Sequence, residues 1–165
     1  MGIFRIARAG AGRLTVALGR RTVTPRALVS YEDLLAAFEW VSSSPAMENG
    51  AFVSKETGST HWTSTVMDLD DEVPEDLDDV NLYVAVPHKN DLDLGKALAL
   101  RFADDVLPES YATIDQFFRR PGAYRRFKDF LDRNGMIQRW YDYEVAAVEK
   151  ALRQWCAEND LQLKS

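Results

Sequence analysis

The sequence predicts an α+β fold, in which a small antiparallel sheet packs against an N-terminal helix and a C-terminal helical half. Two β-rich runs, 51–55 and 60–65, flank a short turn and predict a hairpin. A third run, 82–86, predicts one further strand of the same sheet. From residue 91 onward, apolar residues recur at helical spacing almost to the end of the chain.

The composition indicates one domain. A length of 165 residues with 46% apolar and 11% aromatic content is enough for a buried core. The single cysteine, Cys156, has no partner for a disulfide within the chain, which suits a reducing compartment. No apolar run approaches the roughly 18 residues of a bilayer-spanning helix. We therefore expect a soluble cytoplasmic protein with no membrane partner, and nothing in the sequence indicates a cofactor.

Charge is distributed unevenly along the chain. Residues 1–28 hold six arginines and no acidic residue, which leaves 14 basic and all 26 acidic residues beyond them. Glycines give this segment little to pack, so we expect residues 1–28 to be a poorly ordered basic extension and 29–165 to be a single globular domain. Alternation over 14–18 allows a short strand. Such a basic segment can bind a polyanion, act as an organelle presequence or fold back on its own domain.

The first helix is expected to begin after Ser30 and to run to about Val41. Ser30 is a suitable N-cap, and Asp33 three residues later helps to satisfy the free N–H groups of the first turn. The predicted core face carries Tyr31, Leu34, Leu35, Phe38 and Val41.

The predicted hairpin depends on Gly58, which supplies the positive φ that a short hairpin loop usually requires. His61 and Trp62 are neighbours on the second strand and must point to opposite faces of the sheet. We expect Trp62 to face the core and His61 to be a surface residue.

Residues 68–79 hold eight acidic side chains in twelve positions, and Pro74 interrupts them. Such a density of like charge predicts an exposed loop. Its spacing resembles the start of a calcium-binding loop, but Val73 stands where that loop needs glycine. We expect no metal site.

The C-terminal half is expected to consist of helices. We expect the first to start at Asp91, which would cap it, while Asp93 would complement its dipole. The further helices are expected over about 111–119, 123–133 and 137–159. Glu144 falls on the apolar stripe of the last helix, where a carboxylate must find a partner, and we expect an arginine there.

Several segments together resemble the uncharacterised bacterial protein family numbered 0158 in the UPF series. The resemblance covers about residues 29–159 and is carried by Val29–Trp40, Glu56–Gly58, Pro87–Gly95, Gly122–Asp129 and Trp140–Tyr141. It implies a self-contained bacterial domain and supplies no catalytic residues to carry over.

The first candidate site is the junction between the third strand and the following helix, which groups His88, Lys89, Asn90, Asp91 and Asp93. Free N–H groups at a helix start attract anions, and His88 with Asp91 or Asp93 would make an acid/base pair. The structural alternative is a turn whose two carboxylates only start the helix. We expect the first three residues to be exposed and to be candidates for binding.

The second candidate site is the segment 119–133, in which basic and aromatic side chains alternate. Its candidate binding residues are Arg119, Arg120, Arg125, Arg126 and Lys128. Arginines beside aromatic rings are typical of proteins that bind RNA or single-stranded DNA. The structural alternative places Tyr124, Phe127 and Leu131 in the core and makes i,i+4 ion pairs of Asp129 with Arg133 and Lys128 with Asp132.

No zinc-ligand spacing, nucleophile motif or phosphate-binding loop is present in the sequence, so an enzyme is the weaker interpretation. The leading hypothesis is a non-catalytic cytoplasmic binding or regulatory module that acts through protein contacts. The alternatives are nucleic-acid binding through Arg119 to Arg133 and an enzyme that uses His88 with Asp91 or Asp93.

Overall fold

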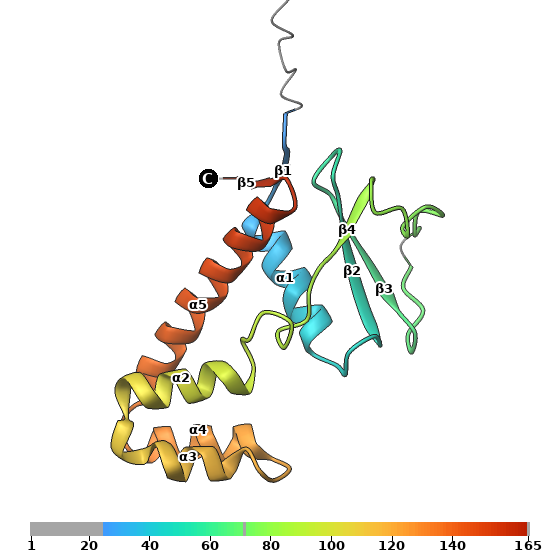
Figure 1. Ribbon diagram of the computed structural model, residues 1–165. Coiled ribbons are helices and arrows are strands. Elements are labelled where there is room, and N and C mark those ends of the chain that lie inside the picture. The colour runs from blue at the N-terminus through green and yellow to red at the C-terminus, as the bar shows by residue number, and fades with distance from the viewer. Residues whose placement is uncertain (1–24, 71, 165) are drawn as a thin grey trace, which may run out of the picture.

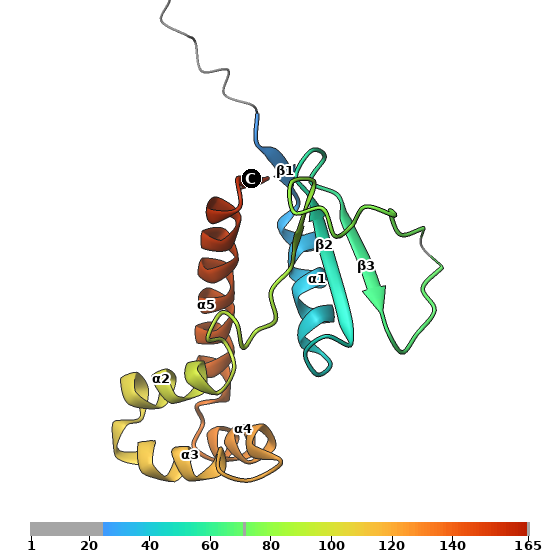
Figure 2. The same ribbon diagram turned by 45° about the vertical axis from the view of Figure 1, so that its right-hand side comes forward.

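The computed structural model describes residues 25–70 and 72–164 and has the α+β architecture that the sequence predicts (Figure 1). In chain order the elements are β1 (Ala27–Val29), α1 (Tyr31–Ser42), β2 (Asn49–Ser54), β3 (Thr60–Ser64), β4 (Tyr83–Ala85), α2 (Lys96–Val106), the 3₁₀ turn η1 (Pro108–Ser110), α3 (Tyr111–Phe117), α4 (Ala123–Arg133), α5 (Ile137–Glu158) and β5 (Leu161–Leu163). Helix α1 lies between the three-stranded sheet and α5, while α2, α3 and α4 gather at the far end of α5 (Figures 1 and 2).

Helix α1 forms as the sequence predicts. The Ser30 side chain accepts a hydrogen bond from the N–H of Asp33 at 3.4 Å, which confirms the N-cap. The residues that α1 buries are Leu34, Ala37, Phe38 and Val41. They follow the helical spacing of the sequence, so this face belongs to the core.

The hairpin and one further strand form the predicted antiparallel sheet, in the order β3-β2-β4. Trp40 of α1 fastens the sheet to the helix, because its indole N–H points at the carbonyl oxygens of Gly50 and Thr63, at 3.1 and 3.2 Å. Trp62 packs on Trp40 with ring centroids 5.7 Å apart, as its predicted core position requires. His61 is less exposed than we expected, since the Tyr83 ring packs edge-on against it.

A second, two-stranded sheet was not predicted. Strand β1 pairs in parallel with β5, so that Ala27 lies opposite Leu161. The N–H of Lys164 continues the pairing with a 2.8 Å bond to the carbonyl of Val29, a residue that is fully buried. Ala27 and Leu28, which we placed in the basic extension, therefore belong to an ordered strand. The predicted strand at 14–18 and the expected disorder of residues 1–24 lie outside the described residues.

The helical half is built around an aromatic cluster. Phe102 of α2, Phe127 of α4 and Trp140 of α5 meet edge to face, with centroid separations of 5.3 Å between Phe102 and Trp140 and 4.9 Å between Phe127 and Trp140. Trp140 is only 1% exposed. Edge-to-face packing of this kind adds roughly 0.5–1.5 kcal/mol per pair beyond the burial of area.

The predicted start of α2 was wrong. The helix begins at Lys96 with Gly95 as its N-cap, and neither Asp91 nor Asp93 lies in its first turn. Asp93 has a φ of 54°, which a right-handed helix does not allow. The carboxylate of Asp91 is used instead inside the preceding turn, where it accepts the N–H of His88.

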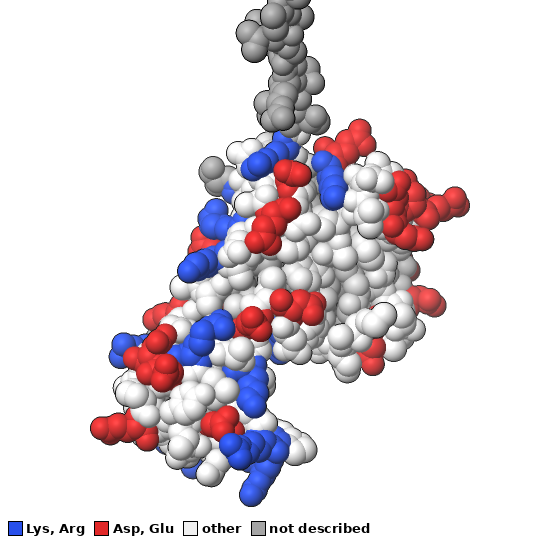
Figure 3. Space-filling view, viewed as in Figure 1, with Lys and Arg blue, Asp and Glu red and all other residues white. Residues whose placement is uncertain are grey.

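Residues 65–82 connect β3 to β4 without a helix or strand among those that the structure describes, as the acidic composition predicts. Acidic side chains project from this side of the molecule in the space-filling view (Figure 3). Leu77 is the buried anchor of the loop, at 8% exposure. Among the described helices, none combines the length and the apolar composition needed to cross a membrane.

Gly58 lies in the hairpin turn, at the point where this turn contacts β1 of the two-stranded sheet. Its φ is 77°, and a Cβ atom at this position would collide with the carbonyl oxygen of Leu28 in β1. Gly58→Ala should therefore lower the free energy of unfolding by about 3 kcal/mol, through backbone strain and the collision together. Urea unfolding measures the loss.

Gly122→Ala is the matched control for this substitution. Gly122 has nearly the same φ, 76°, but nothing lies within 4 Å of the added Cβ. The free energy of unfolding of this variant should fall by only about 1 kcal/mol, which is the cost of placing an alanine in the left-handed backbone region. Equal losses for the two variants would contradict a tight contact between the turn and β1.

Candidate binding groove

The first candidate site, the turn from His88 to Asp93, makes hydrogen bonds that stabilise the turn itself. His88 is buried, at 9% exposure, which corrects the expectation that it is exposed. Its Nδ1 accepts the N–H of Asn90 at 3.1 Å, and its main-chain N–H donates to the carboxylate of Asp91 at 3.0 Å. The carboxylate thus binds the backbone and not the imidazole. The predicted acid/base pair of His88 and Asp91 is not formed.

Asp93 does not supply the pair either. Its side chain is exposed, and it is the main-chain oxygen of Asp93 that accepts a hydrogen bond from Arg101, at 3.1 Å. Asn90 is exposed as predicted, but its side-chain oxygen faces Gly95 at a separation that leaves no room for a Cβ there. These contacts shape the turn and do not converge on a reacting atom.

Lys89 is the residue of this turn that lines a cavity between α1 and α5, whereas Asn90 and Asp93 line a separate open recess of about 330 Å³ beside Gly95 and Lys96. Its N–H donates to the hydroxyl oxygen of Ser42 at 3.0 Å, which ties the turn to the end of α1. Its ammonium group lies 5.3 Å from the centre of the Tyr124 ring, a cation–π distance. Lys89 therefore stands where the turn, α1 and α4 come together.

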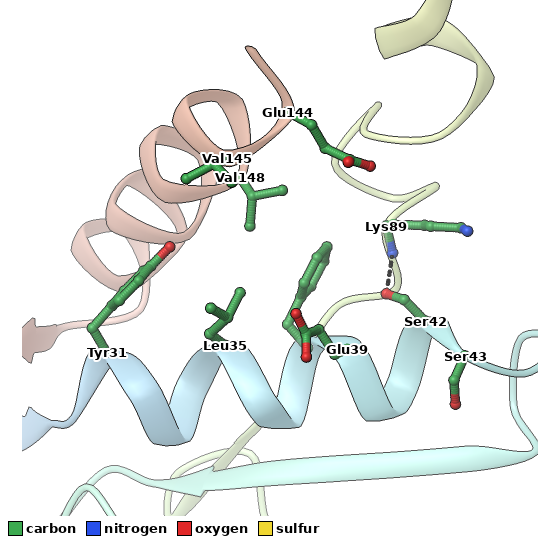
Figure 4. Close-up of a pocket in the computed structure, with 10 residues that line it drawn as sticks. Tyr31, Leu35, Glu39, Ser42, Ser43, Lys89, Glu144, Val145 and Val148 are labelled. Atoms are coloured by element: carbon green, nitrogen blue, oxygen red, sulfur yellow. Dashed lines mark hydrogen bonds between the residues drawn. The ribbon is translucent and has the colours of Figure 1, made fainter. Parts of the chain in front are cut away.

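The cavity is a groove of about 310 Å³ between α1 and α5, with Lys89 at one end and Tyr31 at the other (Figure 4). Its apolar lining comes from Tyr31, Leu35, Phe38, Val145 and Val148, and its polar lining from Glu39, Ser42, Ser43, Lys89 and Glu144. We call this cavity the α1/α5 groove. Val145, on its α5 wall, is 64% exposed. Tyr31, Leu35 and Phe38 lie on the predicted core face of the first helix, so the sequence indicated that they pack inward but not that a space stays open beside them.

Glu144 is the half-buried carboxylate of the groove. Burial raises its pKa, while the nearby charges of Lys128 and Lys89 act in the opposite direction. The arginine partner that we predicted was wrong: within residues 25–70 and 72–164, no arginine lies at ion-pair distance from it. Tyr124 lies near Glu144, and burial together with the negative charge of Glu144 raises the pKa of its hydroxyl group to about 12.

The basic segment does not form one surface. Arg119, Arg120 and Arg126 converge on an open recess of about 500 Å³ at the end of the helical half, beside Gln116 and Phe117. Basic side chains gather at this end of the molecule in the space-filling view (Figure 3). Two of the three arginines have local partners: Arg119 pairs with Asp115 at 2.9 Å, and Arg126 donates to the carbonyl of Pro121 at 2.8 Å.

The remaining basic candidates lie elsewhere. Lys128 stands over the Tyr141 ring at 5.6 Å, and Arg125 is exposed outside the recess. The predicted i,i+4 pairs of Asp129 with Arg133 and Lys128 with Asp132 are not ion pairs in the described part of the chain. Exposed charged side chains of this kind gain little free energy by pairing.

The aromatic side chains of the segment pack on one another. Phe118 contacts Tyr124 and Phe127 at centroid distances of 5.3 and 5.9 Å, and Phe127 is fully buried. This confirms that Phe127 and Leu131 belong to the core face. Rings held in this way are not available to stack on bases, in contrast to the usual single-strand binding platforms.

The described residues contain no group of three or more histidine, cysteine, aspartate or glutamate side chains that could hold a metal ion. Cys156 is buried, and burial raises the pKa of its thiol to about 11. The thiol is therefore protonated at neutral pH and is a weak nucleophile.

The fold and its groove define an α+β domain with an apolar cleft between two helices and carboxylates at the cleft's edge. No protein-family model, curated protein or solved structure matches the chain significantly. The resemblance to the family numbered 0158 in the UPF series stays a prediction.

The raised pKa of Glu144 predicts a pH effect on stability. The folded state favours the protonated carboxyl group, so this residue's contribution is complete below its ordinary pKa of 4.5 and is lost as the pH rises through the higher pKa of the folded protein. Glu144→Gln stays neutral and avoids the loss. The free energy of unfolding of the variant, minus that of the wild type, should rise over this window and then level off. Urea unfolding from below pH 4.5 to neutral pH measures the difference, and a difference independent of pH would contradict the raised pKa.

Proposed function

We propose that the protein is a non-catalytic binding module and that its α1/α5 groove receives a segment of a partner protein. The observation that carries the proposal is an apolar groove left open between two long, well-anchored helices. When a partner covers a partly exposed apolar surface of this kind, the free energy of the system falls.

The lining of the groove indicates the chemistry of the segment. Leu35 and Val148 line it from opposite helices, and the exposed Val145 extends the apolar surface outward. Glu39 and Glu144 place two carboxylates beside these side chains, while Lys89 lines one end of the groove and the charge of Lys128 also reaches Glu144. The complementary segment therefore carries apolar side chains together with arginine or lysine.

The size of the groove limits how the segment binds. A volume of about 310 Å³ is at the lower end of the range for specific ligand pockets. It admits a few side chains and not a folded surface. A short helix or extended stretch that inserts two or three apolar side chains fits these dimensions.

Peptide selection tests this proposal directly. Short peptides selected on the intact protein from a random library should combine apolar and basic residues, and Val145→Lys should weaken their binding at least tenfold, because it adds a charge to the apolar wall. Isothermal titration calorimetry gives the affinities. Ala146→Lys is the matched control, since it adds the same charge at the next exposed position of α5, outside the groove. Selected peptides that bind both variants like the wild type would overturn the proposal.

A second candidate function is binding of RNA or single-stranded DNA through the arginine recess. The observation that favours it is the convergence of Arg119, Arg120 and Arg126 on one open recess beside Phe117. Guanidinium groups bind phosphates bidentately. Because the other rings of the segment are packed internally, such binding would read the phosphate backbone and not the bases.

Salt dependence distinguishes this second function. If the recess binds oligothymidylate or oligouridylate, the Arg120→Ala, Arg126→Ala double variant should reduce the slope of log affinity against log salt by about 1.4, which corresponds to two lost phosphate contacts. Fluorescence anisotropy at several salt concentrations measures the slope. The control is Arg139→Ala together with Arg153→Ala, exposed arginines of α5 outside the recess. An equal change in both double variants would contradict a site in the recess.

A further inference from the structure

We propose that residues 1–24 of this same chain bind in the α1/α5 groove and compete there with a partner. The inference rests on the proposed function, since it names a second occupant of the same groove. Three properties support it: the path of the chain, the chemistry of the segment and the charge around the groove.

The described residues that follow the segment lead directly to the groove. Two residues separate residue 24 from β1, β1 leads into α1 through Ser30, and Tyr31 in the first turn of α1 already lines the groove. A stretch of 24 residues can span up to ~80 Å when extended, whereas the 12 residues of α1 measure about 18 Å. The segment is therefore long enough to turn back and follow the whole groove. A tether this short gives an effective concentration on the order of millimolar.

The chemistry of the segment matches that of the groove. Residues 1–24 contain five arginines and no acidic residue. Their apolar side chains include Ile3, Phe4, Ile6, Leu14, Val16 and Leu18. Such a segment places apolar side chains between Leu35 and Val148 while its guanidinium groups meet Glu39 and Glu144. An arginine also covers apolar surface with its own methylene stem.

The acidic loop is the competing place for an arginine-rich segment. Residues 68–79 offer more negative charge than the groove does. The loop residues Val73 and Val80 are exposed, and Val73 lines a smaller recess of about 240 Å³ whose other lining residues are Thr60, His61, Trp62 and Glu72, a mostly polar surface. Charge alone would therefore give a loose association that salt screens, whereas insertion of apolar side chains persists in salt. The groove combines both interactions, and for this reason we assign the segment to it.

If residues 1–24 occupy the groove, any partner must compete with them to bind there. If residues 1–24 fill the groove about 90% of the time, the apparent affinity for any competing peptide falls roughly tenfold. A partner, or a polyanion that captures the arginines, would then release the groove.

Paramagnetic relaxation enhancement on the full chain tests the inference. A spin label on Gly10→Cys reacts selectively, because the native Cys156 is buried and its thiol is protonated. We expect loss of the methyl signals of Leu35, Val145 and Val148, and persistence of the loss at high salt. Broadening centred on Val73 and Val80, or no specific broadening, would overturn the inference.

A matched pair of variants locates the contact. Glu39→Lys with Val145→Lys changes both a carboxylate and an exposed valine of the groove, and should restore the lost signals of Leu35 and Val148. Asp76→Lys with Val80→Lys makes the same two changes on the acidic loop, where both residues are exposed, and should leave the broadening in place. The opposite result would assign the segment to the loop.

Peptide binding separates this inference from the proposed function. In the full chain, Arg5→Glu, Arg8→Glu and Arg13→Glu together should raise the affinity of a groove-selected peptide about tenfold. If the peptide binds the groove with equal affinity in both proteins, the inference fails and the proposed function stands. If the spin label reports contact with the groove but no selected peptide binds there, the groove serves only its own chain.

Discussion

The parallel pairing of β1 with β5 is the constraint on which the rest of the structure depends. It joins the start of α1 to the end of α5, although more than a hundred residues separate them. From that point the two helices diverge, and the α1/α5 groove is the space between them (Figures 1 and 4). Three residues in each strand give few hydrogen bonds. The burial of Val29 and Leu161 therefore contributes much of the stability of the pairing.

Two separate anchors make the walls of the groove firm. Trp40 holds α1 to the sheet through its indole N–H, and Trp140 holds α5 within the aromatic cluster of the helical half. The turn at His88 to Asp91 connects the two, since Lys89 binds Ser42 with its N–H and reaches the Tyr124 ring with its ammonium group. Of this turn, Lys89 lines one end of the groove, whereas the catalytic candidates His88 and Asp91 do not line it. Their polar groups are used for shape, which explains why they converge on no substrate.

The sequence predicted the elements that local chemistry determines. Ser30 caps α1, Gly58 supplies the positive φ of the hairpin, and the apolar periodicity of α5 gives its position. Local patterns did not reveal β1 and β5, because three-residue strands carry no periodicity and their partner lies at the other end of the chain. The start of α2 was predicted wrongly at Asp91, again because the prediction relied on a local pattern. An aspartate before a helical pattern is a common cap, yet here a positive φ at Asp93 delays the helix to Lys96. The groove was not predicted either, because a sequence shows which side chains are apolar but not how far apart two helices lie.

The direction of the β1–β5 pair has a mechanical consequence. Because the strands are parallel, the chain enters β1 at one end of the pair and leaves β5 at the opposite end. Tension applied through those two segments would load the inter-strand hydrogen bonds in shear, all at the same time. An antiparallel pair held in this way would instead open like a zipper, one bond after another. A force applied between the chain before Ala27 and the chain after Leu163 would therefore load the β1–β5 pair directly, while α1 and the groove lie outside that line of force.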